Sequence, residues 1–157
     1  MSRTKKILYT ILALVIVAQF FGPKKNQGDQ TKVNAFFEET NPSETVKLVL
    51  KESCFDCHSN YTKYPVYNNI TPVNYYLAHH IDEAKEHLNF SEWDSYSDKR
   101  KKRKMEEIGE SVEEGWMPLN SYLWLHPHAK LTSDQVVAVT DWVKFMQVKY
   151  NMDENPQ

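Results

Sequence analysis

The stretch of this chain that best combines reactive side chains at a defined spacing is Cys54-Phe55-Asp56-Cys57-His58. Two thiols three positions apart can both reach the edge of a porphyrin and form thioethers with its vinyl groups. The histidine that follows can then bind the iron from the proximal side. The chain has two cysteines, and both lie in this motif. The pattern therefore predicts covalent attachment of one c-type haem through Cys54 and Cys57, with His58 as an axial ligand.

Three other interpretations of the motif compete with haem attachment. A redox-active C-x-x-C pair expects a βαβ setting, and no strand pattern surrounds these cysteines. A structural zinc site needs two further ligands at ordered spacing, and the remaining histidines do not form an H-x₃₋₅-H array. Chance is the third alternative. The spacing favours haem over all three.

A second iron ligand is predicted in Gly115-Trp116-Met117-Pro118. A methionine thioether can occupy the sixth position of a haem iron, and the proline after Met117 would hold this segment as an extended loop. Met117 could instead be a flexible core residue. His80, His126 and His128 are weaker candidates for the same position, since histidines near an apolar face or in a loop more often pack or form hydrogen bonds.

A helix must deliver the motif to one side of the domain. Asn41-Pro42-Ser43-Glu44 predicts its start, with Asn41 as N-cap, Pro42 at the first helical position and Glu44 completing a capping box. Apolar residues at helical spacing follow and share a face with both cysteines. We therefore expect one helix to carry both thiols and His58.

Three further helices are expected. Thr71-Pro72 opens one with a clear apolar stripe, a charged helix follows, and Leu131-Thr132-Ser133-Asp134 starts the last. The charged helix contains the basic run Lys99–Lys104, followed by several glutamates. This run is predicted to be a solvated face paired with those glutamates. A docking patch for an acidic redox partner or for lipid headgroups is the alternative.

The N-terminal region carries a targeting signal. Basic residues precede an uncharged stretch from Ile7 to Pro23, which is at the short end of the membrane-spanning range of about 17–25 residues. Phe20 and Phe21 stand where a cleavage site needs small residues, so an uncleaved anchor is favoured over a removed signal peptide. We expect a membrane anchor or signal segment at 1–22, a polar tether at 23–40 and a haem domain at 41–150. The charge bias places that domain on the extracytoplasmic side.

Composition narrows the class of function. The chain has 157 residues, 41% hydrophobic and 25% charged, with a formal net charge of -2. These values are typical of one globular domain with an appendage and give no indication of a nucleic-acid partner. With only four glycines there is no phosphate-binding loop, and no catalytic constellation is visible beyond the haem. An electron carrier is therefore favoured over an enzyme.

The order of these motifs resembles a class I cytochrome c and, more narrowly, the bacterial haem-binding domain family of small, anchored, extracytoplasmic proteins. The stretches that carry the resemblance are Cys54-x-x-Cys57-His58-Ser59, Thr62-x-Tyr64-Pro65-x-Tyr67, Leu88-Asn89-Phe90-Ser91-x-Trp93, Trp116-Met117-Pro118 with Tyr122, and His126-Pro127-x-Ala129-x-Leu131-Thr132. Together they span roughly Val46 to Trp142. A charged insert between His58 and Met117 departs from the ordinary cytochrome pattern, so the distal loop need not close in the same way.

The resemblance implies an all-α fold around one haem, with Cys54 and Cys57 as thioether residues, His58 as proximal ligand and Met117 as distal ligand. We expect one-electron transfer between extracytoplasmic redox partner proteins. One alternative is a haem sensor or small haem enzyme with an open distal site. Tyr122, His126 or His128 would there act as hydrogen-bond donor or general acid. An anchored interaction module in which haem mainly supports folding is a third possibility.

Overall fold

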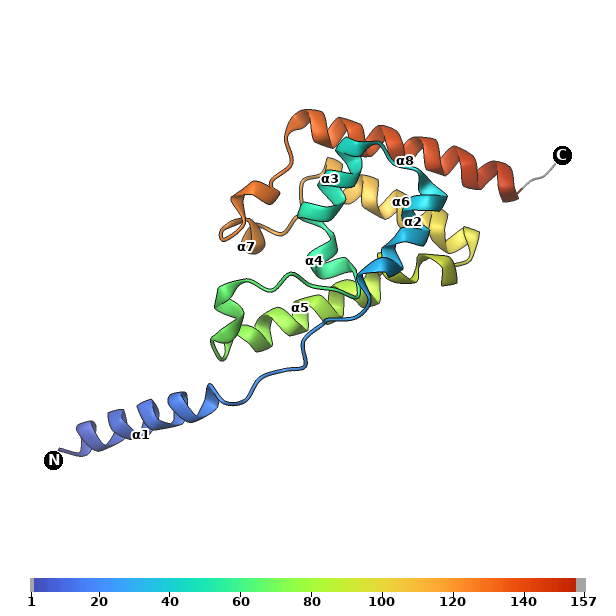
Figure 1. The fold of residues 1–157 in the computed structure, drawn as a ribbon. Coiled ribbons are helices and arrows are strands. Elements are labelled where there is room, and N and C mark those ends of the chain that lie inside the picture. The colour runs from blue at the N-terminus through green and yellow to red at the C-terminus, as the bar shows by residue number, and fades with distance from the viewer. Residues whose placement is uncertain (1, 155–157) are drawn as a thin grey trace.

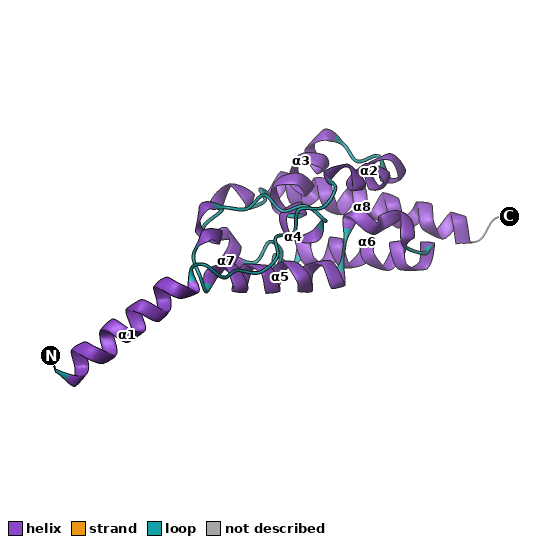
Figure 2. Cartoon of the chain, turned by 60° about the horizontal axis from the view of Figure 1, so that its bottom comes forward, coloured by secondary structure: helices purple, strands orange, loops and turns teal. Residues whose placement is uncertain are grey.

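The computed structural model describes residues 2–154, and within them it is entirely helical, without a β-strand (Figures 1 and 2). The all-α prediction is therefore confirmed. The α-helices are α1 (Arg3–Ala18), α2 (Asn34–Thr40), α3 (Glu44–Ser53), α4 (Phe55–His58), α5 (Val73–His87), α6 (Asp98–Glu113), α7 (Asn120–Leu123) and α8 (Ser133–Glu154). The 3₁₀ helices are η1 (Gln30–Val33), η2 (Val66–Asn69), η3 (Phe90–Ser95) and η4 (Pro127–Ala129).

The pair α6 and α8 is the centre of the packing, and the two helices lie side by side in both views (Figures 1 and 2). Gly109 allows their close approach, because a Cβ at this position would lie 3.0 Å from Cγ1 of Val143. The predicted start of α8 is confirmed as well. Thr132 Oγ1 accepts a hydrogen bond from the Gln135 N–H at 3.3 Å, while Gln135 Oε1 accepts one from the Thr132 N–H at 2.9 Å, a reciprocal capping box.

The start of the helix before the motif differs from the prediction. Asn41 is not an N-cap: it ends α2 in the left-handed conformation, with φ 38°, which asparagine tolerates better than most residues. Ser43 is the N-cap of α3 instead, and its Oγ accepts a hydrogen bond from the Val46 N–H at 3.4 Å. Pro42 lies between these two residues, in the connection from α2 to α3.

Residues 23–40 are not the free tether that the polar composition indicated. Phe36 on α2 has no exposed surface and packs in the main hydrophobic core. Asn26 donates to the carbonyl of Ser59 and to Thr62 Oγ1, both at 2.9 Å. Composition could not show these contacts, because the partners of both residues lie far along the chain.

The basic run of α6 is only partly solvated. Lys101 is buried and pairs with Glu39 of α2 at 2.8 Å. Lys104 is buried as well and pairs with Glu107 on its own helix. The predicted pairing with a following glutamate is thus confirmed for Lys104. The prediction that the basic run forms a solvated face is wrong for Lys101 and Lys104, because α6 turns both side chains toward the domain.

Helix α1 extends away from the other helices (Figures 1 and 2) and has no buried residue. Its apolar side chains, including Leu8, Leu12 and Val15, are half or more exposed. Within residues 2–154, none of the helices has both the length and the apolar character needed to cross a bilayer. The structure therefore does not support the membrane-spanning helix expected at 1–22.

Candidate haem-binding site

The motif lies where the chain breaks between two helices rather than within one. Helix α3 ends at Ser53, and Cys54 takes a non-helical conformation with φ -123° and ψ -45°. The single turn of α4 then carries Cys57 and His58. Phe55 fixes this turn, because its ring packs in the core 5.2 Å from the ring of Phe90. The prediction that one continuous helix carries Cys54, Cys57 and His58 was therefore wrong, because the helix is interrupted at Cys54.

The ring of His58 is held in one orientation. Its Nδ1 lies 3.0 Å from the carbonyl oxygen of Leu88 at the end of α5. A carbonyl only accepts, so Nδ1 carries the proton and Nε2 keeps its lone pair, the arrangement that a metal-binding histidine needs. Burial lowers the pKa of His58, outweighing the opposing effect of the Leu88 hydrogen bond. The imidazole is therefore neutral at pH 7 and able to bind iron.

A cavity of about 510 Å³ opens beside His58, within the range of about 300–1,000 Å³ that is usual for cofactor sites. Its walls come from α3, α4, α5, η3, α6, the loop around Met117 and the segment before α8. The apolar lining side chains are Ala84, Leu88, Phe90, Ile108, Val112, Trp116, Met117, Pro118, Leu119 and Leu131. The cavity thus offers an apolar enclosure with the proximal ligand candidate in its wall.

The loop after α6 brings Met117 to this cavity. Gly115 has φ 74°, a left-handed conformation that costs glycine little. The Met117 N–H donates to the carbonyl of Ser111 on α6 at 3.1 Å. The structure therefore brings together His58 and Met117, which are 59 positions apart in the sequence.

The two thiols differ in their surroundings. Cys54 lines the cavity, whereas Cys57 does not. Cys57 lies on the side of Tyr67 and Tyr122, and its charge when ionised would raise the pKa of both phenols further, beyond the effect of their burial. Burial raises the pKa of Cys54 to about 12 and that of Cys57 to about 11. Both are neutral thiols at pH 7.

The other predicted ligands fall in two places. His80 lines the cavity, together with His87 of the same helix. His126 and His128 do not line it. The Nε2 of His126 is 2.8 Å from the hydroxyl of Tyr67, and its ring stacks on that of Tyr122 at 4.3 Å. Tyr122 is likewise outside the cavity lining, so this cluster lies apart from the predicted distal side.

Sequence reasoning missed the polar part of the cavity wall. His80, Glu83 and His87 lie on one face of α5, and Lys104 with Glu107 on one face of α6. Their spacing of three and four positions is the signal that could have grouped each set. Nothing in the sequence indicates that the two faces meet, because that contact depends on how α5 and α6 pack.

An all-helical domain with a neutral histidine and a methionine thioether in the wall of one cavity offers the kinds of donor that haem iron accepts. Comparison with known families agrees. The model of the haem-binding domain family matches residues 13–145 of the chain, so the protein belongs to this family and binds haem. No curated protein and no solved structure gave a match.

The described residues fit the group that the family implies. His58 Nε2 and the Met117 sulfur provide the nitrogen and thioether donors that haem iron accepts, and the cavity lining supplies an apolar surface for the macrocycle. The predicted membership of a haem-binding domain family is confirmed. Covalent attachment, likeness to class I cytochromes and the identity of the axial ligands stay predictions.

Proposed function

We propose that this protein is a c-type cytochrome that binds one haem covalently through Cys54 and Cys57 and carries one electron. The observation that carries the proposal is the placement of two complementary iron donors in one cavity. His58 has its Nδ1 hydrogen engaged by Leu88 at 3.0 Å, and Met117 lines the same cavity. When bound, the haem supplies the one-electron redox chemistry.

Covalent attachment requires no oxidant. Each thiol S–H adds across a vinyl C=C bond, so that the sulfur bonds to one carbon and the proton goes to the other. The raised pKa values of Cys54 and Cys57 keep both sulfurs protonated in the folded chain and slow their oxidation, which proceeds through the thiolate.

Electron transfer is favoured over catalysis because the chain offers two iron donors, His58 and Met117, in one cavity. If both held the iron, a substrate would have no open position there, and Met/His ligation would raise the reduction potential. Trp116 is 56% exposed and Leu119 38% exposed at the edge of the cavity. We propose that redox partner proteins dock at this edge.

We further propose that α1 attaches the protein to a membrane and that the haem domain lies on the extracytoplasmic side. Between Ile7 and Val17, helix α1 is apolar apart from Thr10, and these residues are exposed. A helix that is apolar all round is normally covered by protein or lipid. Arg3, Lys5 and Lys6 lie at the start of α1, before its apolar part, and support a cytoplasmic N-terminus.

The test is an optical spectrum of the full chain matured with a cytochrome c assembly system. We expect the haem to remain attached after denaturation and the oxidised protein to show the weak long-wavelength band of an iron–thioether bond. That band should disappear in Met117→Ala and persist in the control Met105→Leu, which alters a buried methionine outside the cavity lining.

Two other outcomes would overturn parts of the proposal. A high-spin haem in the unmodified protein that binds CO at once would favour the alternative function, a gas or redox sensor or small haem enzyme with an open distal site. Haem that separates from the chain on denaturation would show that attachment is not covalent.

A further inference from the structure

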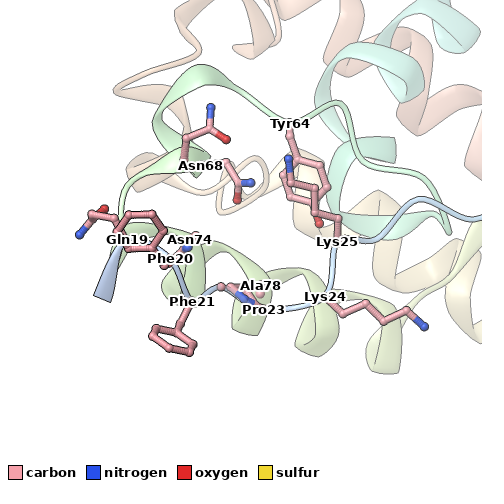
Figure 3. A pocket seen from close by; sticks show the side chains of 12 residues that line it. Gln19, Phe20, Phe21, Pro23, Lys24, Lys25, Tyr64, Asn68, Asn74 and Ala78 are labelled. Carbon is pink, nitrogen blue, oxygen red and sulfur yellow. The ribbon is translucent and has the colours of Figure 1, made fainter. Parts of the chain in front are cut away.

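A second pocket, of about 270 Å³, lies at the point where α1 meets the domain. Figure 3 shows side chains from the end of α1, the segment after it, the η2 region and α5 around this pocket. The base of α1 is fixed here, because Gln19 bonds Thr71 twice. Its Nε2 donates to the Thr71 carbonyl at 3.2 Å, and its Oε1 accepts from the Thr71 N–H at 3.0 Å.

We propose that this pocket binds the phosphate group of an anionic phospholipid. The inference rests on the proposed attachment of α1 to a membrane and goes beyond it, since it assigns a specific headgroup site. It concerns residues that are separate from those lining the haem cavity.

The charge of the pocket fits an anion. Lys24 and Lys25 line it, and the remaining polar side chains are amides and the phenol of Tyr64. No carboxylate is among the residues that form its wall. The ammonium of Lys25 lies 5.5 Å from the centre of the Tyr64 ring, a cation–π contact that holds this lysine at the pocket.

Asn68 provides the second, independent indication. It is only 6% exposed and lines the pocket, yet within residues 2–154 its side-chain amide has no hydrogen-bond partner, whereas its backbone N–H donates to Pro65. Asn74, by contrast, uses its amide to donate to Thr71 and to accept from Tyr75. The amide atoms of Asn68 are not among the fully buried polar atoms that lack a partner within residues 2–154, so they are accessible from the pocket, and a phosphate oxygen would accept an N–H of this amide.

The position of the pocket relative to α1 favours a lipid as the source of the phosphate. Phe20 and Phe21 follow α1 and are 83% and 65% exposed. Both also line the pocket, together with Lys24 and Lys25, and in Figure 3 Phe20 lies beside Gln19 on one side of it and Lys25 beside Tyr64 on the other. Aromatic residues followed by lysines are typical of the level where acyl chains meet anionic headgroups. If α1 enters the bilayer, the pocket lies at the depth of the lipid phosphates.

The experiment uses the full, haem-loaded chain and co-sedimentation with two kinds of vesicle. One is phosphatidylcholine alone, and the other contains phosphatidylglycerol as an anionic lipid. The test variant is Asn68→Asp, which keeps the side-chain shape and places a carboxylate in the pocket. The matched control is Asn34→Asp, which makes the same charge change at an exposed residue of α2. The unchanged haem spectrum and helical circular dichroism verify folding.

We expect the unmodified protein to bind both vesicles and to prefer the anionic ones. Asn68→Asp should lose that preference and keep its binding to phosphatidylcholine, while Asn34→Asp should keep both. Lys24→Gln and Lys25→Gln should each weaken binding to anionic vesicles about five-fold, the usual contribution of one lysine near an anionic surface.

The contrary outcomes are distinct. If Asn68→Asp and Asn34→Asp retain the same anionic preference, the pocket does not recognise a headgroup. If inorganic phosphate binds the pocket and the protein has no preference for anionic vesicles, the ligand is a soluble phosphate. If the unmodified protein binds neither vesicle, membrane attachment by α1 fails as well, and the lipid source fails with it.

Discussion

Replacing Phe36 by alanine tests whether the segment before α3 belongs to the folded domain. The Phe36 ring is fully buried. It lies 4.7 Å from the ring of Phe90, 5.0 Å from Trp93 and 6.0 Å from Trp142. Removing a buried phenylalanine costs about 3–5 kcal/mol in all, and the loss of three aromatic contacts favours the upper part of that range. We therefore expect the free energy of unfolding to fall by about 4–5 kcal/mol.

The assay is equilibrium unfolding in urea, followed by far-ultraviolet circular dichroism on the haem-loaded protein. A loss of this size is a large part of the about 5–15 kcal/mol that stabilises a typical domain. The control Phe20→Ala removes a phenylalanine that is 83% exposed and should change the unfolding free energy by no more than about 0.5 kcal/mol. A loss below about 1 kcal/mol in Phe36→Ala would refute the packing of α2 in the core.

Three further predictions concern the packing around the haem domain. Gly109→Ala should lower the unfolding free energy by about 1–3 kcal/mol, since the new Cβ would lie 3.0 Å from Val143. In thermal unfolding, Gly109→Ala combined with Val143→Ala should lose less stability than the sum of the two single losses. Strictly additive losses would contradict this contact. Thr132→Ala should cost about 1 kcal/mol in urea unfolding by removing the cap of α8, whereas the exposed neighbour Lys130→Ala should be neutral. The pKa of Glu39 is lowered overall: partial burial raises it, but hydrogen bonds from Lys101 and Tyr150 lower it more. The ionised Glu39 side chain therefore contributes its full stabilisation above the unfolded-state pKa near 4.5, and this stabilisation is lost as the pH falls through the lower folded-state pKa. In Glu39→Gln the free energy of unfolding should fall less steeply with decreasing pH below 4.5. The same pH dependence in Glu39→Gln and the unmodified protein would contradict the pairing.

The sequence alone determined the cofactor chemistry and most of the helices, because both depend on residues close together in the chain. The spacing of Cys54, Cys57 and His58 gave the expectation of haem, and membership of the haem-binding domain family supports haem binding. The apolar stripe after Pro72 predicted α5, the charged run predicted α6, and Leu131-Thr132-Ser133-Asp134 predicted the start of α8. Proline and small polar residues marked their ends with local signals that need no tertiary contact.

Predictions from local sequence signals were wrong in two places before the haem motif. Asparagine can begin a helix or end one, and Asn41 ends α2 because α2 itself was not anticipated. A polar composition around residues 23–40 concealed the buried Phe36. For Phe36 the deciding contacts are with Phe90, Trp93 and Trp142, which lie more than fifty positions away.

Tertiary structure alone decided how the site is assembled. The Nδ1 of His58 finds its acceptor 30 positions away, at the end of α5, and Met117 reaches the same cavity through a loop that follows α6. Lys101 and Lys104 are charged residues in a basic run, yet the orientation of α6 buries both beside glutamates. The side-chain types determine which chemistry is available. The long-range packing of the helices determines which donor atoms face the same cavity, and no local sequence pattern encodes that packing.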